Sequence, residues 1–155
     1  YSEYIHKFIG GKCPAVDFIE SKKNMNSVLD IIENELIKSA HDCSMGGLSI
    51  AISELCMINQ VGCNVSLEKI PGEKLDSDKI LFSESHSRYL LTIENKNLSK
   101  LEETLKKHNV SYSLIGEFTG DSICFTGDSK PIIDLSVDKA QKTWYNSLKE
   151  MVLHA

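Results

Sequence analysis

The stretch SAHDCSMGGLSIAISELC, residues 39–56, contains a short polar segment, two adjacent glycines and an apolar pattern at helical spacing. It predicts a strand at 39–42, a turn, and a helix that starts near two adjacent glycines, Gly46 and Gly47. Each glycine costs a helix about 1 kcal/mol relative to alanine, so the pair needs either an anion close to bare backbone or a tight packing contact. The apolar residues of this helix recur at helical spacing and should share one buried face: Leu48, Ala51, Ile52, Leu55 and Cys56.

Polar residues surround the glycine pair. Ser44 is a candidate to cap the helix through its hydroxyl. The first-turn amides have no partner within a helix, and the helix dipole favours a negative charge there. His41 and Asp42 would flank the same place. Two interpretations stay open: the amides of Gly46 and Gly47 bind a phosphate, or the glycines let the helix pack closely against the sheet.

A second polar cluster lies in LFSESHSRYL, residues 81–90, at a turn that feeds a strand. Hydroxyls, one acid and one guanidinium could grip a sugar hydroxyl or a phosphate. Alternatively, a Glu84–Arg88 ion pair and serine caps order the turn, and such exposed pairs contribute little stability. The candidate residues of this cluster are Ser83, Glu84, Ser85 and Arg88.

The order of predicted helices and strands gives an α+β fold, in which helices cover a mixed, partly antiparallel sheet. Residues 1–22 are expected to form a linker with a short helix, and residues 23–155 a domain. The strand–helix–strand–strand order at 88–126 resembles part of a ferredoxin-like unit. Extended segments are expected at 62–67, 88–94, 111–118, 122–127 and 130–137, with a surface loop at 68–80. The segments 111–118 and 122–127 are expected to pair as a hairpin through 119–121.

Three further helices complete the prediction, at 23–37, 97–108 and 137–152. The first should bury Met25, Val28, Ile31, Ile32 and Leu36. The second should bury Leu98, Leu101 and Leu105. The last should bury Ala140, Trp144, Leu148 and Val152.

Composition excludes several classes of protein. A net charge of −5 without a lysine or arginine run argues against a nucleic-acid surface. No segment approaches the roughly 20 apolar residues of a membrane span. The five cysteines are scattered and include no CxxC pair, which favours reduced thiols in the cytoplasm. Because Tyr1 stands where an initiator methionine would, we expect the chain to be part of a longer polypeptide.

Taken together, SAHDCSMGGLSIAISELC, ILFSESHSRYLLTI, IGEFTGD and the late tryptophan resemble the C-terminal domain of the phosphoribosylformylglycinamidine synthase family. SEYIHKFIGGKCPAVDF is similar to the family's link out of a preceding nucleotide-binding domain. The domain type is shared with aminoimidazole ribonucleotide synthetase and its relatives. Because the chain ends shortly after the predicted tryptophan helix, it resembles the second of the family's two tandem copies. His86 stands where the first copy has glutamine, as the resemblance to the second copy implies.

The resemblance implies a function for the whole enzyme. It would be an ATP- and Mg²⁺-dependent ligase of purine biosynthesis, which converts an amide into an amidine with glutamine-derived ammonia. The nucleotide and metal ligands would lie mainly on preceding domains, so no cofactor and no catalytic residue is expected in this chain alone. Its partners would be those domains, a glutaminase subunit and a small accessory subunit. The alternatives are a sibling such as aminoimidazole ribonucleotide synthetase, or a non-catalytic module that binds a small molecule.

Overall fold

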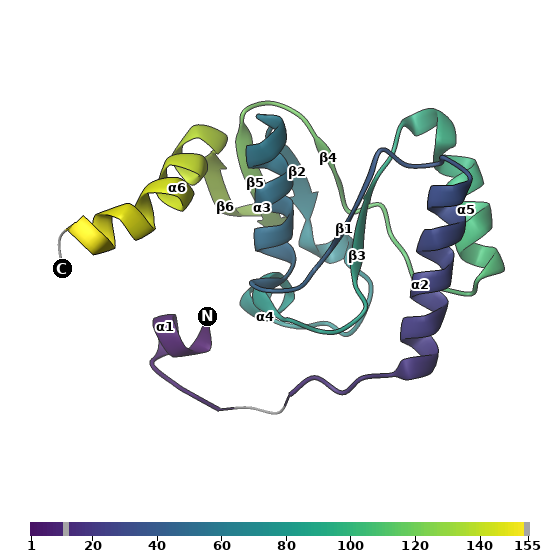
Figure 1. Cartoon of the computed structure of the whole chain (residues 1–155), viewed down its shortest axis with the longest axis horizontal. Coiled ribbons are helices and arrows are strands. Elements are labelled where there is room, and N and C mark those ends of the chain that lie inside the picture. The colour runs from purple at the N-terminus through teal and green to yellow at the C-terminus, as the bar shows by residue number, and fades with distance from the viewer. Residues whose placement is uncertain (11–12, 154–155) are drawn as a thin grey trace. The chain divides into compact units, whose positions relative to one another are not determined.

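The computed structural model describes residues 1–10 and 13–153, and the chain divides into two compact units (Figure 1). The first unit contains Tyr1–Ala51 and Asp78–Tyr112, and the second contains Ile52–Ser77 and Ser113–Ala155. Helices combine with an antiparallel sheet in one unit and a mixed sheet in the other, so the predicted α+β class is confirmed. Among the described residues, no helix is both long enough and apolar enough to cross a bilayer.

The first unit is built around a two-stranded antiparallel sheet. Strands β1 and β3 pair from Ser39 opposite Thr92 to Asp42 opposite Tyr89. Its elements are α1 (Ser2–His6), α2 (Phe18–Glu33), β1 (Ser39–Asp42), the start of α3 (Gly47–Asn59), α4 (Ser77–Phe82, of which Ser77 belongs to the second unit), β3 (Tyr89–Thr92), the 3-10 helix η2 (Asn95–Asn97) and α5 (Leu98–Lys107).

Helix α2 buries a different face from the one predicted. It begins at Phe18, because the Asp17 carboxylate accepts hydrogen bonds from two first-turn amides. Ile31 is fully buried, whereas its neighbour Ile32 is 48% exposed. The helix ends at Glu33, so the chain turns before the buried Leu36. The core of this unit joins α2 and the following residues to α5 through Ile31, Leu36, Leu101 and Leu105.

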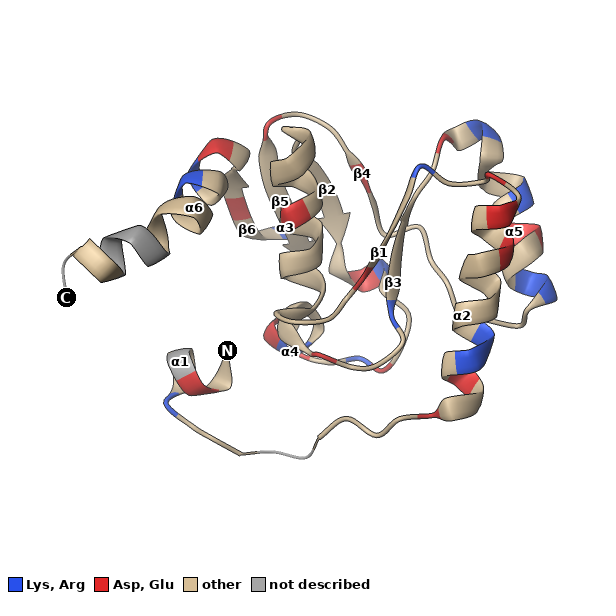
Figure 2. Cartoon of the chain, in the orientation of Figure 1, with Lys and Arg blue, Asp and Glu red and all other residues tan. Residues whose placement is uncertain are grey.

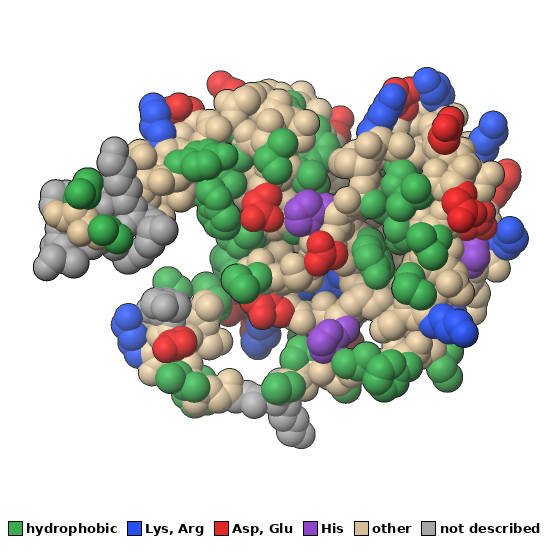
Figure 3. All heavy atoms as spheres, viewed as in Figure 1, with side chains coloured by type: hydrophobic (Ala, Val, Ile, Leu, Met, Phe, Trp, Pro, Cys, Tyr) green, Lys and Arg blue, Asp and Glu red, His purple; other side chains and the backbone are tan. Residues whose placement is uncertain are grey.

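A second apolar stripe on α2 faces outward. Figure 3 shows green side chains at the surface along this helix. The exposed residues are spaced by seven, four and three positions, which places them on one side of the helix. They are Phe18, Met25, Leu29 and Ile32. The predicted burial of Met25 and Ile32 is therefore wrong.

The second unit contains a four-stranded mixed sheet in the order β4-β2-β5-β6. The thiols of Cys56 on α3 and Cys63 on β2 are hydrogen-bonded, which places α3 against this sheet. Apart from α3, the elements are β2 (Cys63–Ser66), the 3-10 helix η1 (Leu67–Lys69), β4 (Gly116–Phe118), β5 (Ser122–Gly127), β6 (Lys130–Ser136) and α6 (Val137–Leu153). The ferredoxin-like order expected at 88–126 is thus divided, because β3 pairs with β1 while β4 and β5 belong to this sheet.

The predicted hairpin between 111–118 and 122–127 is wrong. Strand β2 lies between β4 and β5, antiparallel to the first and parallel to the second. The hairpin of this sheet joins β5 to β6 instead. Its turn residues Asp128 and Ser129 both have positive φ, 48° and 59°, which suits the right-handed twist of a hairpin.

The predicted buried face is confirmed for helix α3 but not for helix α6. Helix α3 carries a single charged residue, Glu54 (Figure 2), and all five residues predicted for its buried face are buried. Helix α6 does not bury the tryptophan: Trp144 is 50% exposed and Val152 is 70% exposed. Figure 1 shows α6 running away from β6, so its later turns leave the sheet of its own unit. The side chain of Leu148 lies outside the described residues.

Candidate functional site

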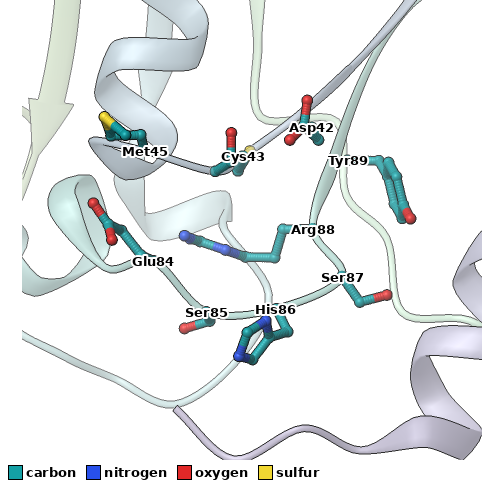
Figure 4. A pocket seen from close by; sticks show the side chains of 10 residues that line it. Asp42, Cys43, Met45, Glu84, Ser85, His86, Ser87, Arg88 and Tyr89 are labelled. Atoms are coloured by element: carbon teal, nitrogen blue, oxygen red, sulfur yellow. The ribbon is translucent and has the colours of Figure 1, made fainter. Parts of the chain in front are cut away.

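The two polar clusters meet at the end of the β1–β3 ladder. Asp42 stands opposite Tyr89, and one residue further the Cys43 amide donates to the Arg88 carbonyl at 3.0 Å. The residues that follow β1 and precede β3 therefore line one pocket of about 540 Å³ (Figure 4). Its lining is Asp42, Cys43, Ser44, Met45, Glu84, Ser85, His86, Ser87, Arg88 and Tyr89. Residues from both polar clusters thus lie around the same pocket.

Glu84 binds the start of helix α3. Its Oε1 accepts a hydrogen bond from the Gly46 amide at 2.9 Å. The Gly47 amide is also occupied, because it donates to the Ser44 carbonyl at 3.0 Å. Ser44 thus acts through its backbone, and among the described residues its hydroxyl makes no hydrogen bond to a helix amide. The predicted hydroxyl cap is wrong, and a carboxylate from a distant part of the chain binds the helix start instead.

Gly47 is required by a close approach of backbone to backbone. A Cβ added at this position would lie 2.6 Å from the Ser83 carbonyl oxygen and 2.8 Å from that of Leu81. Gly47 also has a φ of +67°, a conformation that favours glycine. This supports the packing interpretation of Gly47, although the contact is with the end of α4 and not with a sheet.

Arg88 is not paired with Glu84, so the alternative in which these two residues form an ion pair is wrong. Its Nη2 donates to the Ser83 carbonyl, and its Nε is buried with no hydrogen-bond partner among the described residues. Figure 4 shows the side chain extending across the pocket toward Glu84 and Met45. Burial raises the pKa of the neighbouring Cys43 thiol, while the positive charge of Arg88 acts in the opposite direction.

Hydroxyl and amide groups complete this turn. The hydroxyls of Ser83 and Ser85 lie 2.8 Å apart and share a hydrogen bond. Asn24, on α2, donates to the Ser87 carbonyl at 3.0 Å. The Asn24 Oδ1 and the Ser87 Oγ are buried without a partner among the described residues. Arg88 Nε is the third such atom. Among the described residues, the buried side-chain atoms without a hydrogen-bond partner thus all lie at or beside this turn.

The remaining candidates lie at the edge of the pocket or outside it. His41 is half-buried, its Nδ1 lies 2.6 Å from the Asp42 carbonyl oxygen, and it does not line the pocket. Ser83, Gly46 and Gly47 support the pocket through their backbones. Asp42 is exposed at the rim.

The described residues offer no cluster of three His, Cys, Asp or Glu side chains that could hold a metal ion. In the pocket, the carboxylate of Glu84 is already bound to a backbone amide, which leaves Asp42 as the other acid. These residues do not fit a magnesium site. The arrangement offers one guanidinium and several hydroxyls to a small polar or anionic group.

The candidate residues chosen from sequence did not include Asn24, Cys43, Met45, His86, Ser87 and Tyr89. A sequence signal existed for part of this set. Pairing the predicted strands at 39–42 and 88–94 would have brought residues 43–45 and 87–89 close together. Asn24 carried no signal, since it lies more than 60 residues from its partner Ser87.

Comparison with known proteins identifies the relatives of this chain. Residues 3–126 match the family described as AIR synthase related protein, C-terminal domain. The chain is 35% identical over 143 residues to the phosphoribosylformylglycinamidine synthase subunit PurL of Thermococcus sibiricus, covering 92% of this chain and 19% of the relative. It is 30% identical over 152 residues to the same subunit of Methanocaldococcus jannaschii, covering 98% and 20%. The chain thus spans about a fifth of the length of these relatives.

Solved structures share the fold. A structure of PurL from Thermotoga maritima in complex with FGAR gives a TM-score of 0.77 at 22% identity, covering 85% of this chain and 23% of that one. The PurLQS structure from the same organism gives a TM-score of 0.74 at 22% identity, covering 90% and 24%.

Proposed function

The chain belongs to the family of AIR synthase related proteins, as a C-terminal domain of that family, and we propose that it serves as this domain in a phosphoribosylformylglycinamidine synthase. The whole enzyme would use ATP to activate an amide oxygen, and ammonia derived from glutamine would displace the phosphate. The domain would line a substrate cleft and would not catalyse the reaction alone.

One observation carries this proposal: the similarity to synthase subunits extends over nearly the whole chain, whereas the family match ends at residue 126. A sibling enzyme would also contain the family domain. The alignment with the M. jannaschii subunit covers 98% of this chain, so it extends over most of the region 127–155, which holds β6 and α6. This favours the synthase over its siblings.

The pocket gives the domain its proposed role. Asp42, Ser44, Ser85 and Arg88 would face a phosphate-bearing or sugar-bearing group held between this domain and a preceding one. His41, Gly46, Gly47, Ser83 and Glu84 would hold those residues in place. The described residues do not fit a metal ion, so this role would depend on side chains and backbone alone.

The partners belong to the same proposal. They are the preceding domains of a longer polypeptide, a glutaminase subunit and a small accessory subunit, and the PurLQS structure supports such an assembly. The T. maritima structures with ATP and ADP support a nucleotide requirement of the whole enzyme, which would work with Mg²⁺ in the cytoplasm. Residues 1–22 would link this domain to the preceding one, and the start of α2 at Phe18 supports a boundary a few residues earlier than 23.

The test is complementation between polypeptides. A PurL from Thermococcus sibiricus that lacks the segment aligned with this chain would be mixed with the chain, and ammonia-dependent product formation would be measured. We expect restored activity with the wild-type chain, a strong reduction with Arg88→Met, and no reduction with the exposed control Lys106→Met. ATP hydrolysis by the chain alone, with formylglycinamide ribonucleotide present, would contradict a supporting role.

A further inference from the structure

Both glycine amides at the start of α3 already have partners within the chain. The Gly46 amide donates to the Glu84 carboxylate at 2.9 Å, and the Gly47 amide donates to the Ser44 carbonyl at 3.0 Å. The partial positive charge of a helix start is best matched by a carboxylate or phosphate. Glu84 supplies that negative charge, so an external anion could reach Gly46 only by displacing it.

Arg88 is the cation that the pocket leaves available. A guanidinium has five N–H donors, and the one acceptor found for Arg88 among the described residues is the Ser83 carbonyl. Its Nε is buried without a partner, and no carboxylate of the described chain forms an ion pair with it. Because a guanidinium binds two oxygens of a phosphate or carboxylate at once, it suits an oxyanion.

We propose that Glu84 is a positioning residue, an internal anion that fills the start of α3 and holds the 83–88 turn, so that the pocket takes an external oxyanion at Arg88 and not at the glycine amides. The part about the external anion rests on the proposed function, whereas the role of Glu84 does not. The glycine pair then allows the turn to pack closely against the start of α3. Because the pocket offers an anion one binding place, at Arg88, it would be specific for a single anionic group.

Other contacts constrain the turn that carries Glu84 at both of its ends. Gly47 lies against the carbonyls of Leu81 and Ser83, immediately before Glu84 in the chain. At the other end of the turn, Ser87 has a positive φ of 61° and Arg88 is fixed to the Cys43 amide through its carbonyl. The Glu84–Gly46 bond therefore closes a turn whose two ends are already fixed.

The first experiment needs no ligand. Hydrogen exchange of the Gly46 amide would be measured by NMR in the ¹⁵N-labelled chain, in Glu84→Gln, in Glu84→Ala and in the exposed control Glu117→Gln. We expect faster exchange at Gly46 in both Glu84 variants and no change in the control. An unchanged exchange rate in both Glu84 variants would overturn the positioning role, whatever the pocket binds.

The second experiment uses inorganic phosphate as the probe. In the wild type, phosphate should shift the Arg88 side-chain Nε–H resonance and leave the Gly46 amide in place, and Arg88→Met should abolish binding while Arg88→Lys retains part of it. In Glu84→Ala, phosphate should also shift the Gly46 amide and bind about two- to fivefold more tightly, as expected for removing one like charge from a helix start.

Two outcomes would overturn the inference about the anion. A shift of the Gly46 amide in the wild type as large as that of Arg88 would show that Glu84 does not exclude the ligand. The absence of any phosphate shift in the wild type would refute the anion site at Arg88, and it would leave the ligand-free result on Glu84 standing by itself.

Discussion

The Glu84 carboxylate accepts a hydrogen bond from the Gly46 amide across 38 residues of sequence, and it does not pair with Arg88 four residues away. Local spacing favoured the Glu84–Arg88 pair, because the two side chains belong to one turn. The tertiary structure places the positive start of α3 within reach of Glu84, and Arg88 turns to the Ser83 carbonyl. These two interactions, Glu84 with the Gly46 amide and Arg88 with the Ser83 carbonyl, set the geometry of the candidate site.

Gly47→Ala should destabilise the first unit strongly. Its Cβ would meet two carbonyl oxygens at 2.6 and 2.8 Å, and its φ is +67°. We expect a loss of about 2–5 kcal/mol in the free energy of unfolding, from left-handed strain and the steric contact together. Urea denaturation measures it.

Gly120→Ala is the matched control for this prediction. Gly120 has nearly the same φ, +68°, but nothing lies within 4 Å of a Cβ built there. We expect a loss of about 1–2 kcal/mol from backbone strain alone. Equal losses at Gly47 and Gly120 would refute the close contact at Gly47.

Ile31→Ala should cost far more stability than Ile32→Ala. Ile31 is 0% exposed in the core of the first unit, and Ile32 is 48% exposed. We expect losses of about 2–5 kcal/mol for the buried residue and less than about 1 kcal/mol for the exposed one. Urea denaturation of the two variants compares them directly, and the reverse order would restore the helix face predicted from sequence.

Asp30 should make the stability of the first unit depend on acid pH. Hydrogen bonds from His108 Nε2 at 2.8 Å and then from Lys107 Nζ at 3.3 Å hold the pKa of Asp30 below its ordinary value of 3.8. A lowered folded-state pKa stabilises the fold fully above pH 3.8, and this contribution is lost as the pH falls through the folded-state value.

Asp30→Asn tests this dependence. The variant should be less stable than the wild type at neutral pH, and the difference should shrink below pH 3.8. The control is Asp138→Asn, which removes an exposed pair with Lys142 on α6 and should change stability little. A difference in the free energy of unfolding between Asp30→Asn and wild type that stays constant down to strongly acidic pH would contradict the prediction.

Cys13 should be the fast-reacting thiol of the folded chain. It is exposed, whereas Cys43, Cys56 and Cys63 are buried, and burial raises the pKa of the Cys43 thiol. A colorimetric thiol reagent added to the native chain should show one fast phase, which Cys13→Ser removes and Cys124→Ser leaves unchanged. A fast phase that survives Cys13→Ser would place a reactive thiol elsewhere.

Trp144, the single tryptophan, should report an exposed environment. Both acrylamide and iodide should quench its fluorescence in the native chain, because half of its surface is open to solvent. Emission at short wavelength that resists iodide would show that α6 packs its tryptophan, as the sequence pattern had predicted.

Local chemistry was enough to select some of the residues that line the pocket, and their role in binding stays a prediction. Ser44, Ser85 and Arg88 were chosen because hydroxyls and a guanidinium near a turn suit a polar ligand, and all three line the pocket. The residues that support the pocket from a distance could not be found this way. Asn24 reaches the Ser87 carbonyl from α2, and only the packing of α2 beside the turn brings it there.

Local patterns in the sequence were enough to predict the α+β class and the buried face of α3. Helical spacing and strand patterns are local, and each needs only a stretch of neighbouring residues. Tertiary structure alone decided which face of α2 is buried, that β2 lies between β4 and β5, and that Glu84 binds Gly46. These depend on free energies of contact between residues far apart in the chain, which no local pattern encodes.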